Sequence, residues 1–235
     1  MNRVYAALSA VLIGAVSAIP AVGQAGSEVQ QKLAAVKQSA AENQQKLHNY
    51  QWVETTQLTL KGDPKPGTQS LCRYGPDGKV QKTALGAPQQ AAPSGGRMKQ
   101  RIVAKKKEEM QDYMGGVKTV IGMYVPPDPQ RMQQAFQAQK VSLNSTAGSG
   151  VALLVFKDYA QPGDQMTISF NTATKKIEAL NVKTYMDNPQ DGVTLAVTFA
   201  GLPDGTNYVQ QSVLDATAKQ LQVTTTSSNY QPVGQ

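Results

Sequence analysis

The last third of the chain constrains the fold most, because it alternates short β-type runs with turns. These runs begin at Val151 and continue to Thr226, and only a few residues connect one to the next. Apolar and polar residues alternate most clearly in Met166/Ile168/Phe170 and Val193/Leu195/Val197/Phe199. Parallel strands need crossovers of about a dozen residues or more, so this region predicts an antiparallel sheet with one apolar and one wet face.

Helical periodicity dominates two earlier segments. Residues 27–48 predict a helix with Ser27 as its N-cap, and its expected apolar stripe is Val29, Leu33, Val36, Ala40 and Leu47. A second helix is expected from Arg97 to about Tyr124, with Gly115-Gly116 kinking or splitting it. Asp128 and Pro129 predict the start of a short third helix.

Between the two helical segments, residues 50–85 are rich in Trp, Val, Thr and Leu and predict about three strands. Gly75-Pro76-Asp77-Gly78 indicates a hairpin turn, and residues 86–96 read as an exposed linker. The predicted order is therefore a helix, about three strands, a helical insertion over 97–140 and about six strands. This order predicts an α+β fold with helices on one face of the sheet.

The N-terminus has the layout of a secretory signal peptide. Arg3 precedes an uncharged apolar run, and Gly23-Gln24-Ala25 predicts cleavage after Ala25. The run is shorter than the ~20 residues of a membrane-spanning helix, so we expect none in the mature chain. No cysteine lies at the cleavage site, so no lipid anchor is expected there. Residues 26–235 are expected to form one secreted or periplasmic domain.

Composition excludes several classes of function. The net charge of +7 is modest and few aromatics accompany the cations, so nucleic acid is not an expected partner. Cys72 is the one cysteine, which rules out an intramolecular disulfide, and it is expected to be a small buried residue. His48 is the one histidine, so we expect no catalytic residue, metal site or cofactor. Asp77, Asp187, Asp191 and Asp204 are interpreted as turn residues.

The order of elements resembles the bacterial lipoprotein carrier (LolA/LolB-like) superfamily across nearly the whole mature chain. The resemblance implies that the antiparallel sheet is curved into an unclosed half-barrel, with the N-terminal helix and the central helical insertion packed on its concave face. It implies an apolar cavity, but no motif allows a functional residue to be transferred. The stretches 49–56 and 124–130 also resemble uncharacterised secreted bacterial proteins.

Two groups of residues are candidates for binding. Methionine is flexible and is frequent where a surface accepts varied apolar partners. The expected lining of an apolar groove is Trp52, Leu58 and Leu60 on one strand, with Met110, Met114 and Met123 above them, although the same residues also fit an ordinary core. The expected contact with an anionic membrane surface is Arg97, Lys99, Arg101, Lys105, Lys106 and Lys107, although these cations also fit a solvated helix face.

The sequence leaves three functional hypotheses open. The first is a non-enzymatic envelope protein that binds an acyl chain, a lipid or a lipidated partner in an apolar groove. The second is a structural or interaction module of the cell envelope with a filled core. The third is a hydrolase of envelope polymers that uses two converging carboxylates, which the sequence does not locate. The ligand, the oligomeric state and the strand order are not determined by the sequence.

Overall fold

The computed structural model describes residues 22–86, 97–145, 148 and 150–234. The side chains of residues 22–25 and 97–100 lie outside this description, as do nearly all of the expected signal peptide and all of the expected linker except Gly86. No helix within the described ranges is long and apolar enough to cross a membrane.

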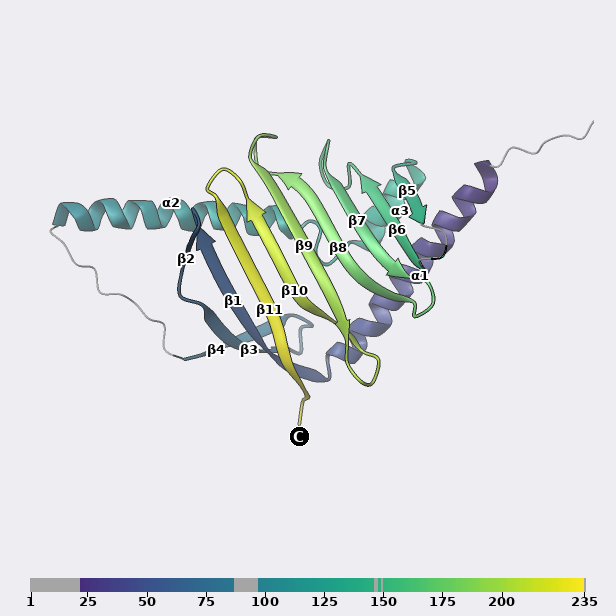
Figure 1. The fold of residues 1–235 in the computed structure, drawn as a ribbon, viewed down its shortest axis with the longest axis horizontal. Coiled ribbons are helices and arrows are strands. Elements are labelled where there is room, and N and C mark those ends of the chain that lie inside the picture. The colour runs from purple at the N-terminus through teal and green to yellow at the C-terminus, as the bar shows by residue number, and fades with distance from the viewer. Residues whose placement is uncertain (1–21, 87–96, 146–147, 149, 235) are drawn as a thin grey trace, which may run out of the picture.

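The described chain forms an α+β fold (Figure 1). The helices are α1 (Val22–Leu47), α2 (Arg97–Ile121) and α3 (Pro129–Gln137). The strands before α2 are β1 (Tyr50–Leu60), β2 (Asp63–Pro64), β3 (Thr68–Tyr74) and β4 (Val80–Leu85). The strands after α3 are β5 (Val141–Ser145), β6 (Val151–Lys157), β7 (Gln165–Asn171), β8 (Lys176–Tyr185), β9 (Gly192–Gly201), β10 (Asn207–Ala216) and β11 (Leu221–Pro232).

All strands belong to one antiparallel sheet that does not close on itself. The order is β4-β3-β1-β11-β10-β9-β8-β7-β6-β5, and β2 pairs with β1 beside this path. The pairing of β1 with β11, from Tyr50↔Pro232 to Leu60↔Leu221, joins the N-terminal hairpins to the C-terminal meander. The predicted antiparallel α+β class is confirmed.

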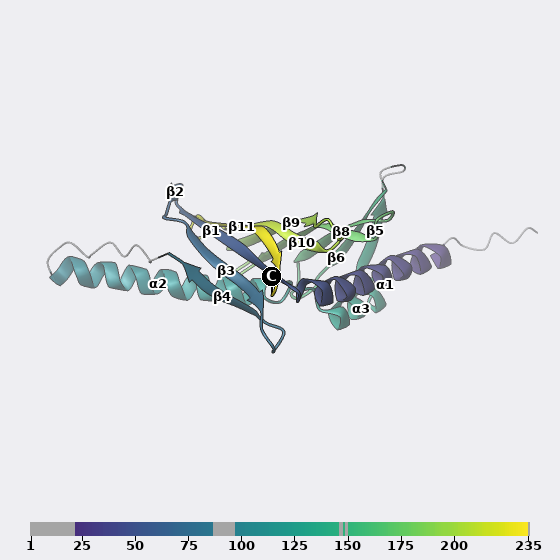
Figure 2. The same cartoon turned by 90° about the horizontal axis from the view of Figure 1, so that it is seen from below.

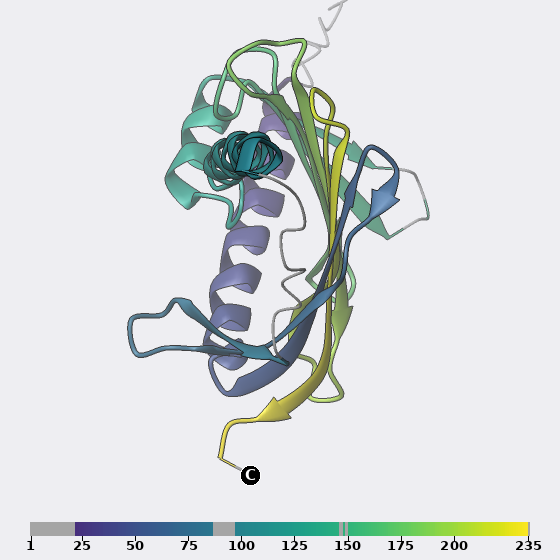
Figure 3. The same ribbon diagram turned by 90° about the vertical axis from the view of Figure 1, so that its left-hand side faces the viewer.

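All three helices lie on the same, concave side of the sheet (Figures 2 and 3). The buried side chains that face them alternate along β6 to β9, as Leu154 and Phe156 do on β6 and Met166 and Ile168 do on β7. None of the three described helices lies on the other face. The sheet therefore has the one-sided burial that its alternating sequence predicts.

A first hydrophobic core fills the space between α1, α3 and strands β5 to β9. Val29, Leu33 and Val36 of α1 are buried against it, and Met132 and Ala135 of α3 complete its cover. The stripe predicted on α1 is wrong at Ala40, which is exposed, whereas Leu47 is half-buried. At the level of Ala40, α1 lies over polar turns instead of apolar strands.

Element boundaries differ from the predictions in three places. Helix α1 begins at Val22, five residues before the expected N-cap Ser27, so residues 22–26 are helical as well. Strand β5 was not expected, and it pairs with β6 at the edge of the sheet. Helix α2 runs unbroken through Gly115-Gly116, so the predicted kink is wrong. A Cβ on Gly116 would lie 2.6 Å from Cε of Met186, so this glycine allows close packing instead.

Candidate binding surface on helix α2

Helix α2 is anchored to the sheet by its C-terminal half. Val117 is 3% exposed and packs in a second hydrophobic core with Val193, Ala216 and Leu221. Tyr113 adds a polar contact, because its hydroxyl donates to Oδ1 of Asp191 at 2.8 Å. This core lies over β9, β10, β11 and β1, and Ile121 and Leu214 pack against both it and the first core.

The N-terminal half of α2 extends past the β4 edge of the sheet (Figures 1 and 2). All side chains from residue 101 to 109 are exposed, including Ile102 at 54% and Val103 at 60%. Val103 lies fourteen residues before Val117, which is about four helical turns, so the two valines lie on nearly the same face. The face that packs on the sheet therefore continues without a described partner.

Four cations accompany these apolar side chains, namely Arg101, Lys105, Lys106 and Lys107. Within the described part of the chain, the structure assigns none of the four to an ion pair. Glu108 and Glu109 follow them and offset part of the positive charge. Arg97 and Lys99 lie in the first turn of α2, and their side chains are outside the described part. We call residues 101–107 the projecting surface.

The structure places the six predicted groove residues in different clusters. Leu58, Leu60 and Met114 pack on the second core. Met123 packs on the first core, and Met110 is half-buried on α2.

Trp52 belongs to an aromatic cluster at the other end of β1. Its ring stacks on Tyr230 with centroids 5.4 Å apart, and Tyr74 lies 5.6 Å away. Tyr74 in turn stacks on His48 at 4.5 Å, just beyond the end of α1. The cluster packs the connection between α1 and β1 against the sheet.

The inner face of β1 shows why these clusters stay separate. Glu54 and Thr56 share the strand parity of Trp52 and Leu58 and lie between them. Glu54 forms an ion pair with Lys82 of β4. The inner face of β1 therefore changes from aromatic to polar to aliphatic, a pattern that the sequence already contains.

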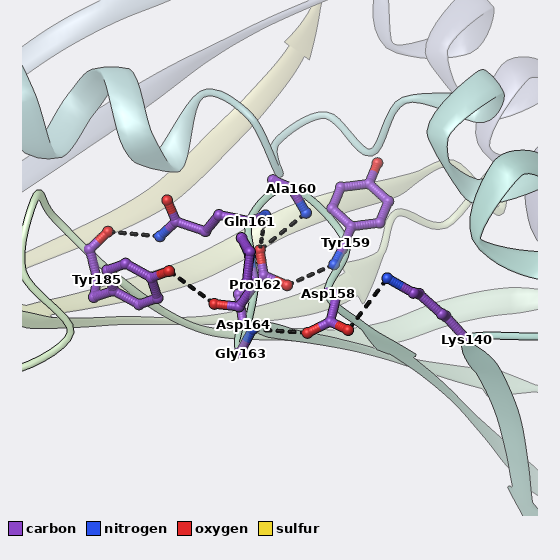
Figure 4. Close-up of polar contacts among 9 residues, drawn as sticks. All are labelled: Lys140, Asp158, Tyr159, Ala160, Gln161, Pro162, Gly163, Asp164 and Tyr185. Carbon is purple, nitrogen blue, oxygen red and sulfur yellow. Dashed lines mark hydrogen bonds and ion pairs between the residues drawn. The ribbon is translucent and has the colours of Figure 1, made fainter. Parts of the chain in front are cut away.

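A buried carboxylate that sequence reasoning missed anchors the segment that follows α2. Asp164 is 3% exposed in the β6–β7 loop and accepts hydrogen bonds from the backbone N–H groups of Tyr159, Ala160 and Gln161 at 2.6, 2.9 and 2.8 Å (Figure 4). The hydroxyl of the fully buried Tyr124 also donates to it. We call this arrangement the Asp164 clamp.

The same loop is fixed from two further sides (Figure 4). The amide of Gln161 donates to the carbonyl oxygen of Tyr185 at 2.8 Å, and Asp158 accepts from the N–H of Gly163 at 2.7 Å. Lys140 pairs with Asp158 at 3.2 Å. Since the acceptor sites of Asp164 are filled by donors of the fold, the clamp is a structural device that holds the α2–α3 connection to the sheet.

Burial and hydrogen bonding shift the pKa values of the tyrosines beside α2. Burial, with the hydrogen bond to Asp191, raises the pKa of Tyr113 to about 12. Burial, with the hydrogen bond to Asp164, raises the pKa of Tyr124 further still. Both hydroxyls are therefore neutral donors at physiological pH.

The acids examined in the sequence mostly take turn roles. Asp77 accepts from the backbone N–H of Lys79, and Asp204 accepts from that of Thr206. Asp191 differs, because it also receives the Tyr113 hydroxyl and so links its turn to α2. Cys72 is fully buried, which confirms its prediction, and burial raises the pKa of its thiol. Over the described ranges, no three His, Cys, Asp or Glu side chains gather as metal ligands would.

Comparisons with known proteins give one distant likeness. No protein-family model matches the chain, and a search of curated proteins finds no match. A crystal structure of a DUF1329 family protein from Desulfovibrio piger aligns with 88% of this chain and 94% of its own, at 9% identity and a TM-score of 0.43. That score is too low to establish a shared fold, so the function must be argued from this chain's own residues.

Proposed function

We propose that this protein is a non-enzymatic binding module of the cell envelope that attaches to anionic lipid surfaces through the projecting surface of α2. The observation that carries the proposal is the exposure of Ile102 and Val103 beside Arg101, Lys105, Lys106 and Lys107 on a helix half that extends past the sheet. Cations and apolar side chains on one helix are the combination that binds at a lipid interface.

Magnitudes favour a reversible contact. Each cation near an anionic bilayer contributes about 1 kcal/mol, and burying a valine or isoleucine side chain adds roughly 1.5–3 kcal/mol at most. The carboxylates of Glu108 and Glu109 reduce the electrostatic contribution of the cations. The balance supports attachment that weakens with salt, because screening shortens the reach of exposed charges.

The test is sedimentation of the mature chain with vesicles that contain a phosphatidylglycerol fraction, compared with pure phosphatidylcholine vesicles. We expect binding to the anionic vesicles alone. Replacing Arg101, Lys105, Lys106 and Lys107 by Gln should lower the partition coefficient by more than roughly tenfold. A matched control changes four other exposed cations to Gln, namely Lys65, Lys79, Lys157 and Lys183.

Two outcomes would reject the proposal. Equal binding of both charge variants would mean that net charge alone attracts the protein. Equal binding to neutral and anionic vesicles would show that the cations do not drive attachment. A Ile102→Ser/Val103→Ser variant separates the apolar contribution, and it should weaken attachment without changing its salt dependence.

Uptake of an acyl chain into a groove is the competing hypothesis, and the same preparation tests it. The aliphatic residues expected to line the groove pack on cores already filled by Val117, Leu154 and their neighbours. A fluorescent fatty acid that binds stoichiometrically to delipidated protein in the absence of vesicles would favour the groove. If the fatty acid instead binds only when anionic vesicles are present, surface attachment is favoured.

A further inference from the structure

A polar cleft beside the C-terminal half of α1 is distinct from the projecting surface. It measures about 370 Å³ and lies between α1, the β7–β8 turn and the β9–β10 turn. Three lysines line it, namely Lys46 on α1, Lys175 in the β7–β8 turn and Lys176 at the start of β8. We call it the α1 cleft.

The floor of the cleft is rigid. The side-chain amide of Asn43 donates to the carbonyl oxygen of Asn207 at 2.5 Å and accepts from its N–H at 2.6 Å. The side chain of Asn207 donates onward to the carbonyl oxygen of Ile177 at 2.7 Å. These bonds fix α1 against both turns, so the position of Lys46 relative to Lys176 is set by the fold.

One acid, Glu42, lines the cleft itself, and a second, Asp204, lies near Lys46. Glu42 accepts from the amide of Gln38 at 2.8 Å. Asp204 accepts from the N–H and hydroxyl of Thr206 and from the hydroxyl of Tyr50. The hydrogen bond from the Thr206 N–H is the main cause that lowers the pKa of Asp204, and the charge of Lys46 adds to it.

Three lysines and one acid line the cleft, so its net charge favours an anion. Over the described ranges, the structure assigns none of the three lysines to an ion pair. Lys176 lies over the β9–β10 turn, since a Cβ on Gly205 would be 3.6 Å from its Nζ. That distance is an ordinary van der Waals contact, so Gly205 and the end of the Lys176 side chain are neighbours.

We propose that the α1 cleft binds a small organic anion, a sugar that carries a phosphate or a carboxylate. The lysines would hold the anionic group, and Ser39 and Thr174 supply hydroxyls to the remaining space, beside the Glu42 carboxylate that holds the Gln38 amide. The volume is within the range of small-molecule sites and far exceeds the ~30 Å³ share of one water, so a monosaccharide phosphate fits better than inorganic phosphate alone.

The experiment is calorimetric titration of the mature chain with glucose 6-phosphate, inorganic phosphate and glucose. We expect saturable binding of glucose 6-phosphate, weaker binding of phosphate and none of glucose. Glucuronate, which carries a carboxylate on a similar ring, distinguishes the two anionic groups. A Lys46→Gln/Lys176→Gln variant should weaken binding of glucose 6-phosphate by roughly tenfold or more, as loss of two charge-assisted contacts predicts.

The control is Lys79→Gln/Lys183→Gln, which removes the same charge from distant exposed sites and should bind as the native chain does. Equal weakening in both variants, binding of glucose as tight as that of its phosphate, or no saturable heat with any anion would overturn the proposal. The α2 charge variant should keep this binding, so failure here is separable from failure of the vesicle experiment. Unchanged thermal unfolding confirms that the exposed lysines are not needed for folding.

Discussion

The two halves of α2 carry similar apolar side chains and have opposite surroundings. Val117 in the anchored half is 3% exposed against the sheet, whereas Val103 in the projecting half is 60% exposed. Around Val117 the helix adds the Tyr113–Asp191 hydrogen bond and the close approach at Gly116. Around Val103 it adds cations to which the structure assigns no ion pair within the described ranges.

The contrast separates residues that hold the fold from residues that are free to bind. Burial of apolar area stabilises the anchored half, and an exposed valine contributes almost nothing. The projecting half can therefore change its sequence, or engage a surface, at little cost to the folded state. The predictions below test this division, beginning with the largest expected effect.

Replacing Asp164 by Ala should cost about 3 kcal/mol of unfolding free energy, because three backbone N–H groups and the Tyr124 hydroxyl lose a buried acceptor. Urea unfolding measures the loss. Asp158→Ala removes an exposed ion pair with Lys140 and the bond from the N–H of Gly163, and should cost much less. Equal losses would mean that the clamp does not anchor the segment after α2.

Replacing Val117 by Ala should cost about 2 kcal/mol, from lost burial of two methyl groups and the cavity that remains. The matched change Val103→Ala should stay within about 0.5 kcal/mol of the native chain. Urea unfolding under identical conditions measures both changes in unfolding free energy. A substantial loss at Val103 would show that the projecting half has a partner within the fold.

The anchored half should loosen in alkali. The pKa of Tyr113 is raised to about 12, so its stabilising share is fully present below pH 10 and is lost as pH rises from 10 toward 12. Unfolding free energies from pH 8 to 11.5 should fall less steeply for Tyr113→Phe than for the native chain. Parallel curves would show that this hydroxyl does not titrate differently in the two states.

The glycine pair gives the smallest effect. Gly115 has open space where a Cβ would stand, so Gly115→Ala should stabilise the protein by up to about 1 kcal/mol through helix propensity. Gly116→Ala gains the same propensity but must displace the methyl group of Met186. It should therefore stabilise less than Gly115→Ala in thermal unfolding, and an equal gain would contradict the close packing.

Periodicity in the sequence predicts the antiparallel sheet and the helix positions, since alternation and the 3.6-residue stripe follow directly from burial. It does not give helix ends: Ser27 looks like an N-cap, but the residues before it are helical as well. Nor does it give strand order, because pairing β1 with β11 joins residues far apart in the chain. The polar residues Glu54 and Thr56 on β1 already indicate in the sequence that the apolar face of this strand is interrupted.

The candidate surfaces divide in the same way. The cations of α2 can be read from the sequence, but their location past the sheet edge depends on where the second core ends. Asp164 looks like an ordinary turn residue, and its role appears only when Tyr124 is brought to it. The α1 cleft combines lysines from two elements that no local pattern relates.

Hydrogen exchange of backbone amides, with and without phosphatidylglycerol vesicles, tests the division of α2 most directly. Without vesicles, residues 101–109 should exchange much faster than residues 113–121. Added anionic vesicles should protect residues 101–109 and leave 113–121 unchanged. Equal protection of both halves in the free protein, or vesicle protection confined to other segments, would contradict the account.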